Sequence, residues 1–366
     1  MILTHKIQLI TNHEHVVFFK KACGVRRFCY NWGLEQWNEQ YQSGLKPNGT
    51  KLRNELTSIK SNFPWMYESP KDVLQHAFVD LQQSFNNFFE KRTKYPTFKK
   101  KNRSRDSFYL SNGQFWIKDK KIKIPKLGIL KLTESLRYEG KIQSATISRQ
   151  ANKWFVSISV DVVNPYKERK SNNEISLDFG LKYVYTDQHG NHIDPLDQSR
   201  KEKQLKRYQR RYSRNKNNYN ESNRKRKLLL KVQKLYKQIR DKKQDYNHKI
   251  SYKICHENKV IYLEDLTING WQKLWGKKSQ NNAIGELRRQ IFYKAKIFNN
   301  EVVIIDKWFP SSKMDHKTGE YLKDLTLSDR WIIHPDGTRT DRDQNAAINI
   351  MNEGRRLLEL GTAIPM

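Results

Sequence analysis

At residues 174–187 the chain reads Glu174-Ile175-Ser176-Leu177-Asp178-Phe179-Gly180-Leu181-Lys182-Tyr183-Val184-Tyr185-Thr186-Asp187. A run of β-branched and aromatic residues, a turn at Gly180 and a second such run predict a β-hairpin. Asp178 ends the first predicted strand. An acid at such a position commonly forms a turn, so the stretch alone leaves two interpretations of Asp178 open, a turn former or a functional carboxylate.

The composition of the chain indicates a polyanionic partner. Its 366 residues include 70 Lys and Arg against 38 Asp and Glu, a formal net charge of +32. Such a charge repels itself unless a polyanion offsets it, so nucleic acid is the expected partner. A basic membrane-surface protein is the competing interpretation, but it requires a long apolar or amphipathic anchor, and no apolar run here exceeds a handful of residues. The first twenty residues also lack the apolar segment of a signal peptide, which predicts a cytoplasmic protein without a membrane partner.

The first half of the chain predicts a helical subdomain and a set of short strands. Helices are expected over 15–42 and 70–89, where apolar residues recur at three- and four-residue spacing, and their aromatic side chains are expected to form a core. The alternating residues 6–10 predict an edge strand. Further strands are predicted at 107–110, 115–117, 121–124, 129–132, 144–148 and 154–160. Many short strands with regular turns favour a small β-barrel, which the strand at 6–10 could join.

The second half predicts an α/β layout. Residues 201–250 carry 19 Lys and Arg against 4 Asp and Glu, a net charge of +15, with Leu228, Val232, Leu235 and Ile239 on one helical face. This pattern predicts a helical hairpin with its tip at 215–223, either a solvated charged helix pair or, as we favour, one that faces nucleic acid. Buried strands are expected at 260–264 and 302–306, and helices at 285–299 and from Asp341 onward.

Three acids occupy comparable structural positions. Asp178 and Glu264 end predicted strands, and Asp343 lies in the first turn of the last predicted helix. They are either caps and turn formers or a metal site. Two Mg²⁺ ions that clamp the attacking and leaving oxygens of a phosphodiester need several convergent carboxylates, because Mg²⁺ prefers oxygen ligands. The order Asp, Glu, Asp, with the last acid on a helix, is what an RNase H-like nuclease core supplies.

Motifs along almost the whole chain resemble one family. They are Cys29-Tyr30-Asn31-Trp32; Leu74-Gln75 through Asn87-Phe88-Phe89; Tyr95-Pro96-Thr97-Phe98-Lys99; Ile124-Pro125-Lys126-Leu127-Gly128; Leu177-Asp178-Phe179-Gly180-Leu181-Lys182; Leu263-Glu264-Asp265-Leu266; Tyr293-Lys294-Ala295; Phe309-Pro310-Ser311-Ser312-Lys313; and Asp341-Arg342-Asp343 through Asn345-Ala346-Ala347-Ile348-Asn349-Ile350. In their joint order and spacing they resemble the TnpB (OrfB-type) proteins of bacterial insertion sequences, relatives of the type V CRISPR effectors.

The resemblance implies a fold and its domains. The fold class is an α/β RNase H-like (RuvC-like) nuclease domain plus a small, wedge-like β-barrel with an inserted helical recognition subdomain. The barrel is expected at 1–10 and 95–165, and the recognition subdomain at 11–94. The RuvC-like domain is expected at 170–366, with a basic helical insert at 200–255 and a degenerate zinc-knuckle insert at 311–340.

The resemblance also implies a function. It predicts an RNA-guided DNA endonuclease of a transposable element that cleaves double-stranded DNA next to a short adjacent motif, with Asp178, Glu264 and Asp343 holding two Mg²⁺ ions. The guide RNA would derive from the element's own end, and the protein would act as a monomer in a ribonucleoprotein, in the bacterial cytoplasm at the nucleoid.

Candidate nucleic-acid contacts fall in two sets. Those for reading the DNA motif, where amide and ammonium groups can meet base edges, are Lys71, Gln75, Ser111 and Asn112. Those for the nucleic-acid backbone are Arg26, Arg27, Lys99, Lys100, Lys101, Arg103, Arg105, Lys206, Arg207 and Arg210. For the extended basic segment at 95–105 a solvated linker is the alternative.

The chain departs from the family at the zinc knuckle. The family carries four cysteines there, whereas this chain has Asp315, Thr318, Ile333 and Asp336 at the corresponding positions and only Cys23, Cys29 and Cys255 elsewhere. We therefore expect no zinc. Asp315, His316, His334 and Asp336 could hold a different ion, although oxygen-rich, loosely spaced sets seldom form structural zinc sites.

Two further functions are compatible with the sequence. One is an RNA-guided DNA-binding protein with weak or no cleavage, which the loss of the knuckle cysteines favours and the presence of all three acids disfavours. The other is a conventional DNA transposase, whose acids usually follow the order Asp, Asp, Glu.

Overall fold

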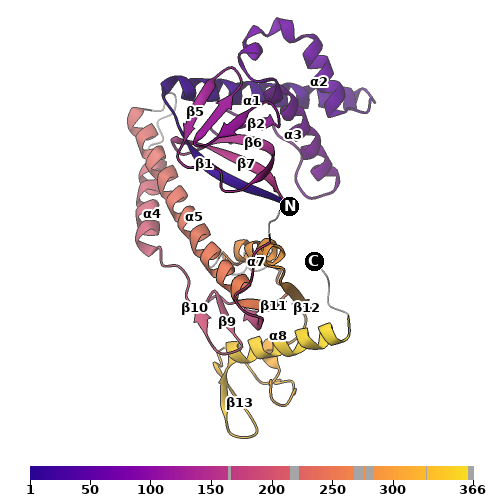
Figure 1. The fold of residues 1–366 in the computed structure, drawn as a ribbon, viewed down its shortest axis with the longest axis vertical. Helices are drawn as coiled ribbons and strands as arrows, with labels where there is room; N and C mark the ends of the chain where they lie inside the picture. The colour runs from indigo at the N-terminus through magenta and orange to yellow at the C-terminus, as the bar shows by residue number, and fades with distance from the viewer. Residues whose placement is uncertain (164–165, 215–221, 268–275, 277–282, 327, 362–366) are drawn as a thin grey trace. The chain divides into compact units, whose positions relative to one another are not determined.

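The computed structural model describes residues 1–163, 166–214, 222–267, 276, 283–326 and 328–361. The chain divides into two compact units, an N-terminal unit of residues Met1–Asn164 and a C-terminal unit of residues Pro165–Met366 (Figure 1). In the described part of the chain, no helix is both long and apolar enough to span a lipid bilayer.

A seven-stranded sheet forms half of the N-terminal unit. Its strands are β1 (Ile2–Ile10), β2 (Ser107–Ser111), β3 (Trp116–Lys118), β4 (Lys121–Ile124), β5 (Gly128–Leu132), β6 (Gly140–Gln150) and β7 (Lys153–Val162). Their order is β2-β6-β7-β1-β5-β4-β3. The prediction that the first strand joins the later ones is confirmed, because β1 pairs antiparallel with both β7 and β5. Within the described residues of this unit no pairing links β2 to β3, so closure into a barrel stays a prediction.

Helices form the other half of this unit. They are α1 (His13–Gln42), α2 (Gly49–Ser58), α3 (Lys71–Phe89) and the short 3₁₀ turns η1 (Lys60–Asn62) and η2 (Pro64–Glu68). The predictions for α1 and α3 are confirmed. The two pack closely at Gly33, where a Cβ atom would lie 2.7 Å from the Phe78 ring. The sequence did not predict α2, which buries only Leu52, Leu56 and its first residue and so shows a weak apolar stripe.

A five-stranded sheet forms the centre of the C-terminal unit. Its strands are β8 (Asn173–Asp178), β9 (Tyr185–Asp187), β10 (His192–Ile193), β11 (Asn258–Glu264) and β12 (Glu301–Ile305), in the order β10-β9-β8-β11-β12. The predicted hairpin is confirmed, since β9 pairs antiparallel with β8. The strand β11 runs parallel to both β8 and β12. All three carboxyl ends therefore lie at one edge of the sheet.

Helices cover both faces of this sheet (Figure 1). They are α5 (Asn223–Glu257), α7 (Ile284–Phe298) and α8 (Arg342–Glu359), and α4 (Ser199–Arg214) packs on α5. On one face Val260 and Tyr262 of β11 form a cluster with Ile350 and Met351 of α8. Side chains alternate along a strand, so the buried Ile261 and Leu263 point to the face of α5 and α7. At Gly354 of α8 a Cβ atom would lie 2.2 Å from the Tyr262 ring, so only glycine permits this approach.

The remaining elements follow β12. They are the 3₁₀ turn η3 (Ser311–Lys313) and the two-stranded sheet of β13 (Trp331–Ile333) and β14 (Arg339–Asp341). The helical hairpin of α4 and α5 is confirmed, but most of its predicted tip lies outside the described residues.

Candidate carboxylate site

The register of the parallel strands brings two of the predicted acids together. Leu263 of β11 lies opposite Leu177 of β8, so Glu264 and Asp178 form the next pair in register at the ends of their strands. Side chains in register on parallel strands point to the same face. Glu174, on the same face of β8 as Asp178, forms an ion pair with Arg355 of α8. Asp178 and Glu264 therefore point to the face that α8 covers.

The third acid, Asp343, lies in the first turn of α8. Asp341 caps this helix, because its Oδ1 accepts a hydrogen bond from the backbone N–H of Asp343 at 2.9 Å. Asp343 is partly buried, with 25% of its side chain exposed. The cap fixes the backbone of Asp343 at the helix N-terminus, where a negative charge is favoured.

The electrostatics of Asp178 indicate that the other two acids lie near it. The pKa of Asp178 is raised well above its ordinary value by burial first, then by the charges of Asp343 and Glu264. Burial raises the pKa of Glu264 to about 7, Arg288 opposes this shift, and Asp265 adds to it. Such a carboxyl is stabilised either by a bound proton or by a nearby cation. Oxygen ligands of this kind fit a divalent metal ion such as Mg²⁺.

Two arginines border the acids, and the sequence did not predict a role for either. Arg288 of α7 is 8% exposed, and its guanidinium lies 3.9 Å from Asp265. Arg342 lies 3.8 Å from Asp343 and lowers the pKa of Asp178. The sequence predicts a helix over Arg288 but does not indicate that its side chain is buried. Its neighbours in the site come from a strand more than twenty residues earlier in the chain.

The raised pKa of Glu264 makes the stability of the metal-free protein depend on pH. A carboxyl whose pKa is higher in the folded state contributes stability that is present below its ordinary value of 4.5 and lost as the pH rises through about 7. In a chelating buffer, we expect Glu264→Gln to have a higher Tm than wild type at pH 8 but not at pH 4.5. Thermal unfolding of both proteins checks this, and Mg²⁺ should restore the wild type at pH 8. An equal Tm difference at both pH values would contradict it.

A buried pair holds the segment that precedes α8. Asp315 Oδ1 and His334 Nδ1 lie 2.8 Å apart, and their side chains are 2% and 0% exposed. Burial raises the pKa of Asp315. Hydrogen bonds from His334 and from the backbone of Lys317 and Thr318 lower it by more, so the pKa lies below its ordinary value. Asp315 is therefore a carboxylate, and His334 Nδ1 donates. His334 Nε2 lies 2.8 Å from Thr340 Oγ1, one residue before the cap of α8.

Further hydrogen bonds tie this segment to α8. Asn345 Nδ2 donates to Met314 O, and Asn349 Nδ2 donates to Ser311 O. The backbone N–H of His316 donates to Asn345 Oδ1 at 3.0 Å. The position of Asp343 thus depends on contacts on both sides of the helix start.

The four predicted ion ligands of this segment are only partly brought together. Ligand atoms of Asp315, His316 and His334 lie within 4.8 Å of one another. Asp336 instead pairs with Lys317. His316 Nδ1 lies 2.8 Å from Asn345 Oδ1, so each of the three has a protein partner already. Without Asp336, these three side chains supply three of the four ligands that a structural zinc site uses.

In the N-terminal unit, the predicted motif-reading residues lie at one junction. The buried Asp72 accepts hydrogen bonds from the backbone N–H and the hydroxyl of Ser111, at 2.7 and 2.8 Å. This joins the start of α3, with exposed Lys71 and Gln75, to the end of β2, which exposed Asn112 follows. The backbone N–H and the hydroxyl of Ser111 both donate to Asp72 in this structure. The sequence did not predict Asp72, because its partner lies 39 residues away.

Arg26 and Arg27 form ion pairs within the N-terminal unit. Arg26 pairs with Asp80 and donates to the backbone O of Ser107, while Arg27 pairs with Asp106. Both guanidinium groups are partly buried and hold α1 against α3 and β2. Both arginines thus have carboxylate partners in this structure, and contact with a nucleic-acid backbone at these two residues stays a prediction.

The basic segment at 99–105 begins at a fixed point. Asn31 of α1 accepts from the backbone N–H of Lys99 at 2.7 Å and donates to its O at 3.0 Å. Lys99 and Arg105 line a cleft of about 490 Å³ with Asn87 and Gln83. The side chains of Lys100, Lys101, Arg103 and Arg105 are exposed.

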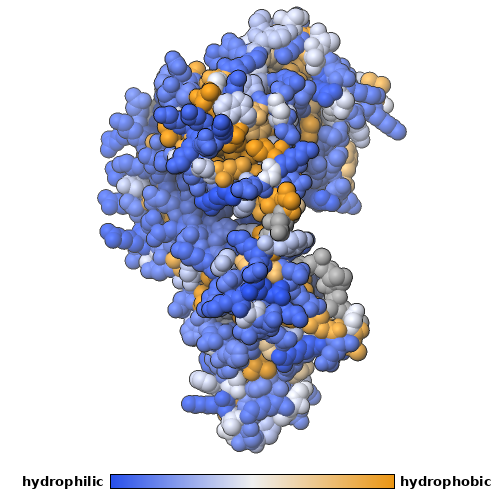
Figure 2. All heavy atoms as spheres, viewed as in Figure 1, coloured by the Kyte–Doolittle hydropathy of each residue, from blue (hydrophilic) through white to orange (hydrophobic). Residues whose placement is uncertain are grey.

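The predicted basic residues of α4 are also exposed. Lys206, Arg207 and Arg210 line one shallow groove together with Lys203, Arg211 and Arg214. The apolar side of the hairpin is a small cluster of Leu205, Val232 and Leu235. Hydrophilic side chains cover α4 and α5 in the view of Figure 2.

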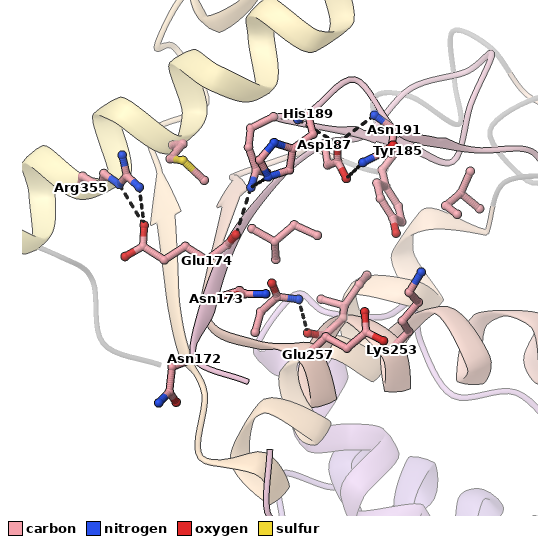
Figure 3. Close-up of a pocket in the computed structure, with 16 residues that line it drawn as sticks. Asn172, Asn173, Glu174, Tyr185, Asp187, His189, Asn191, Lys253, Glu257 and Arg355 are labelled. Atoms are coloured by element: carbon pink, nitrogen blue, oxygen red, sulfur yellow. Dashed lines mark hydrogen bonds and ion pairs between the residues drawn. The ribbon is translucent and has the colours of Figure 1, made fainter. Parts of the chain in front are cut away.

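A deep pocket of the C-terminal unit is separate from the acids (Figure 3). Its volume is about 800 Å³, and it lies beside the first half of β8, lined by Asn172, Glu174, Lys253 and Glu257. Gln188 covers the edge of β8 there, accepting from Ser176 N and donating to Glu174 O. Asp178 ends the same strand beyond this region.

Three family models match the chain. One described as "Probable transposase" (OrfB of the IS605 type) matches residues 157–274, and one described as "Cas12f1-like, TNB domain" matches residues 285–350. A "Helix-turn-helix domain" of the same OrfB type matches residues 1–46, which form β1 and the single long helix α1 in this structure.

Relatives match over nearly the full length. The chain is 27% identical to the "Putative RNA-guided DNA endonuclease InsQ" of Escherichia coli (strain K12), over 98% of this chain and 94% of the relative. It is 29% identical to a "Putative RNA-guided DNA endonuclease" of Streptomyces pristinaespiralis, over 98% of this chain and 91% of the relative. Among solved structures, a Cas12f1–sgRNA–target DNA complex is similar in fold, with a TM-score of 0.57 and 14% identity over 93% of this chain and 83% of that chain.

Proposed function

Because the chain belongs to the OrfB (TnpB) family of insertion-sequence proteins, we propose that it is an RNA-guided DNA endonuclease that cleaves by metal-dependent phosphodiester hydrolysis. The observation that carries this proposal is the cluster of Asp178, Glu264 and Asp343. Full-length similarity to proteins named as RNA-guided DNA endonucleases supports it.

The three carboxylates would hold the metal ions, of which we expect two, both Mg²⁺. When bound, such ions stabilise the attacking and leaving oxygens of the phosphodiester. The chain's own contribution is to fix the ligands. Asp178 and Glu264 are fixed by the strand register, and Asp343 by the Asp341 cap. Arg342 lowers the raised pKa of Asp178, and Arg288 lowers that of Glu264, so both would limit the repulsion at the site.

The proposed partners are a guide RNA from the element's end and a double-stranded DNA target, bound by a monomer. Two exposed basic surfaces support phosphate contacts. They are the segment with Lys99, Lys100, Lys101, Arg103 and Arg105, and the groove of α4 with Lys206, Arg207 and Arg210. For the motif beside the target we propose Lys71, Gln75 and Asn112, which the Asp72–Ser111 bonds hold at one junction.

The proposal is tested by purifying the protein from its native locus. We expect a defined RNA to co-purify, and the complex to cleave members of a DNA library with randomised flanks next to one short motif when Mg²⁺ is present. A pure protein without bound RNA, and no cleavage of any library member, would contradict the proposal.

Two other functions remain as outcomes of this experiment. A guided DNA-binding protein would enrich the library without cutting it. A conventional transposase would instead give strand-joined products. The description of the family model as a transposase fits the second, but three clustered acids in the order Asp, Glu, Asp favour hydrolysis.

We also propose that the segment at 311–341 is held without zinc. Asp315, His334 and Thr340 close it by hydrogen bonds, and the cysteines of the chain are elsewhere and buried. Elemental analysis of the purified protein should therefore find no stoichiometric zinc, and a zinc-selective chelator should leave its Tm unchanged. One zinc per chain would show this proposal to be wrong.

A further inference from the structure

Trp308 is exposed to an unusual degree. Its side chain is 81% exposed, whereas the other exposed tryptophans of the described residues, Trp65, Trp116 and Trp331, are 41%, 41% and 51% exposed. Single exposed apolar residues are common on protein surfaces, so exposure alone has no meaning. The surroundings of Trp308 distinguish it.

The backbone that carries Trp308 is fixed. Asp306 Oδ1 accepts from the backbone N–H of Trp308 at 2.7 Å, and Asp306 O accepts from Phe309 N at 3.1 Å. Phe309 packs on the apolar cluster of Tyr262, Ile305 and their neighbours. The tight turn thus places the Phe309 ring against the core and the Trp308 ring in solvent. A fixed backbone reduces the conformational entropy that the segment loses when Trp308 binds a partner.

The turn lies at the end of the sheet that carries the acids. Ile305 is the last residue of β12 and pairs with Glu264 of β11. The chain then continues through Asp306 and Lys307 to Trp308. Lys307 Nζ lies 5.2 Å from the centroid of the Trp308 ring. An aromatic face and an ammonium group therefore occur together beside the carboxylate edge.

We propose that Trp308 stacks on an unpaired base of the DNA strand that enters the carboxylate site, with Lys307 meeting the adjacent phosphate. The inference rests on the proposed function and assigns to Trp308 a contact with the DNA strand at the point of cleavage. Inside a duplex both faces of a base are covered, whereas an unpaired base offers a face to an indole without the cost of unstacking a base step. Stacking tolerates every base because each has a π-face. The ammonium group of Lys307, near the ring, would attract the phosphates of the strand.

The test compares Trp308→Leu with Trp308→Phe. Leucine keeps apolar volume without an aromatic face, while phenylalanine keeps a face. The ribonucleoprotein is prepared with Asp178→Ala to prevent cutting and bound to targets that carry 2-aminopurine at successive positions of the unpaired strand. We expect quenched fluorescence at one or two positions, recovered in Trp308→Leu and largely kept in Trp308→Phe. With Asp178 intact, the Leu variant should cleave about tenfold more slowly, within the range of a lost base stack.

A second arm distinguishes this inference from the proposed function. Short single-stranded 2-aminopurine oligonucleotides are titrated into the protein and its variants without cleavage. If the wild type cuts no target but quenches these oligonucleotides through Trp308, the proposed function fails and the stacking site stands. Trp116→Ala, an exposed tryptophan of the other unit, is the control and should behave as wild type. Equal quenching in wild type and Trp308→Leu, or equal losses in Trp308→Phe and Trp308→Leu, would overturn the inference.

Discussion

Asp178→Ala is expected to abolish target cleavage while guide RNA and target DNA remain bound. Loss of a metal ligand removes several kcal/mol of transition-state stabilisation, which corresponds to a rate decrease of about 10³-fold or more. The substitution should not unfold the protein. Burial and the charges of Asp343 and Glu264 raise the pKa of Asp178, so in metal-free protein at pH 8 this carboxylate destabilises the fold.

The measurement is a set of single-turnover cleavage rates, with binding and Tm recorded on the same preparations. Asp324→Asn, which neutralises an exposed carboxylate of the same unit, is the matched control and should cleave as wild type. Cleavage by Asp178→Ala within tenfold of the wild-type rate would remove Asp178 from the site. A loss of Tm in metal-free Asp178→Ala would instead assign it a structural role.

His334→Ala is expected to have the second large effect. It leaves the carboxylate of Asp315 buried without its partner, and breaking a buried pair costs about 3–5 kcal/mol. The cost falls on the segment at 311–341, and through Thr340 and the Asp341 cap on the position of Asp343. We expect faster hydrogen exchange over this segment and slower cleavage, with guide RNA still bound.

Two further variants interpret this result. Lys317→Ala breaks an exposed pair of the same segment, with Lys317 and Asp336 38% and 54% exposed, and should cost less than about 1 kcal/mol. The double variant Asp315→Leu with His334→Leu removes both partners, and should be more stable than His334→Ala because no charge is left unpaired. Hydrogen exchange in His334→Ala that matches the wild type would contradict the role of the pair.

Elements with a strong local pattern could be predicted from the sequence. Continuous apolar runs indicate β11 and β12, and three- and four-residue spacing indicates α1, α3 and α8. The acids could be predicted because each stands at the end of such an element. The strand register that places Asp178 beside Glu264 could not, since nothing local to 174–178 or 258–264 specifies which strand is the neighbour.

Polar pairs between residues far apart in the chain could not be predicted from the sequence either. Asp72 and Ser111, Arg27 and Asp106, and Asp315 and His334 are each ordinary polar residues in the sequence. Only the fold shows that Arg27 forms an ion pair with a carboxylate. A basic residue next to a carboxylate in space looks the same in sequence as one next to solvent. The resemblance to a family indicates where function lies, but not which charges are already used.

The Asp315–His334 pair also affects how the protein depends on its host. A knuckle closed by four cysteines folds only as fast as the cell delivers zinc, and competes for that supply with every other zinc protein. A segment closed by a carboxylate and an imidazole would need no metal from the cell, because both groups belong to the chain. If the segment holds without zinc, as proposed, the start of α8 would form equally well in a host starved of transition metals.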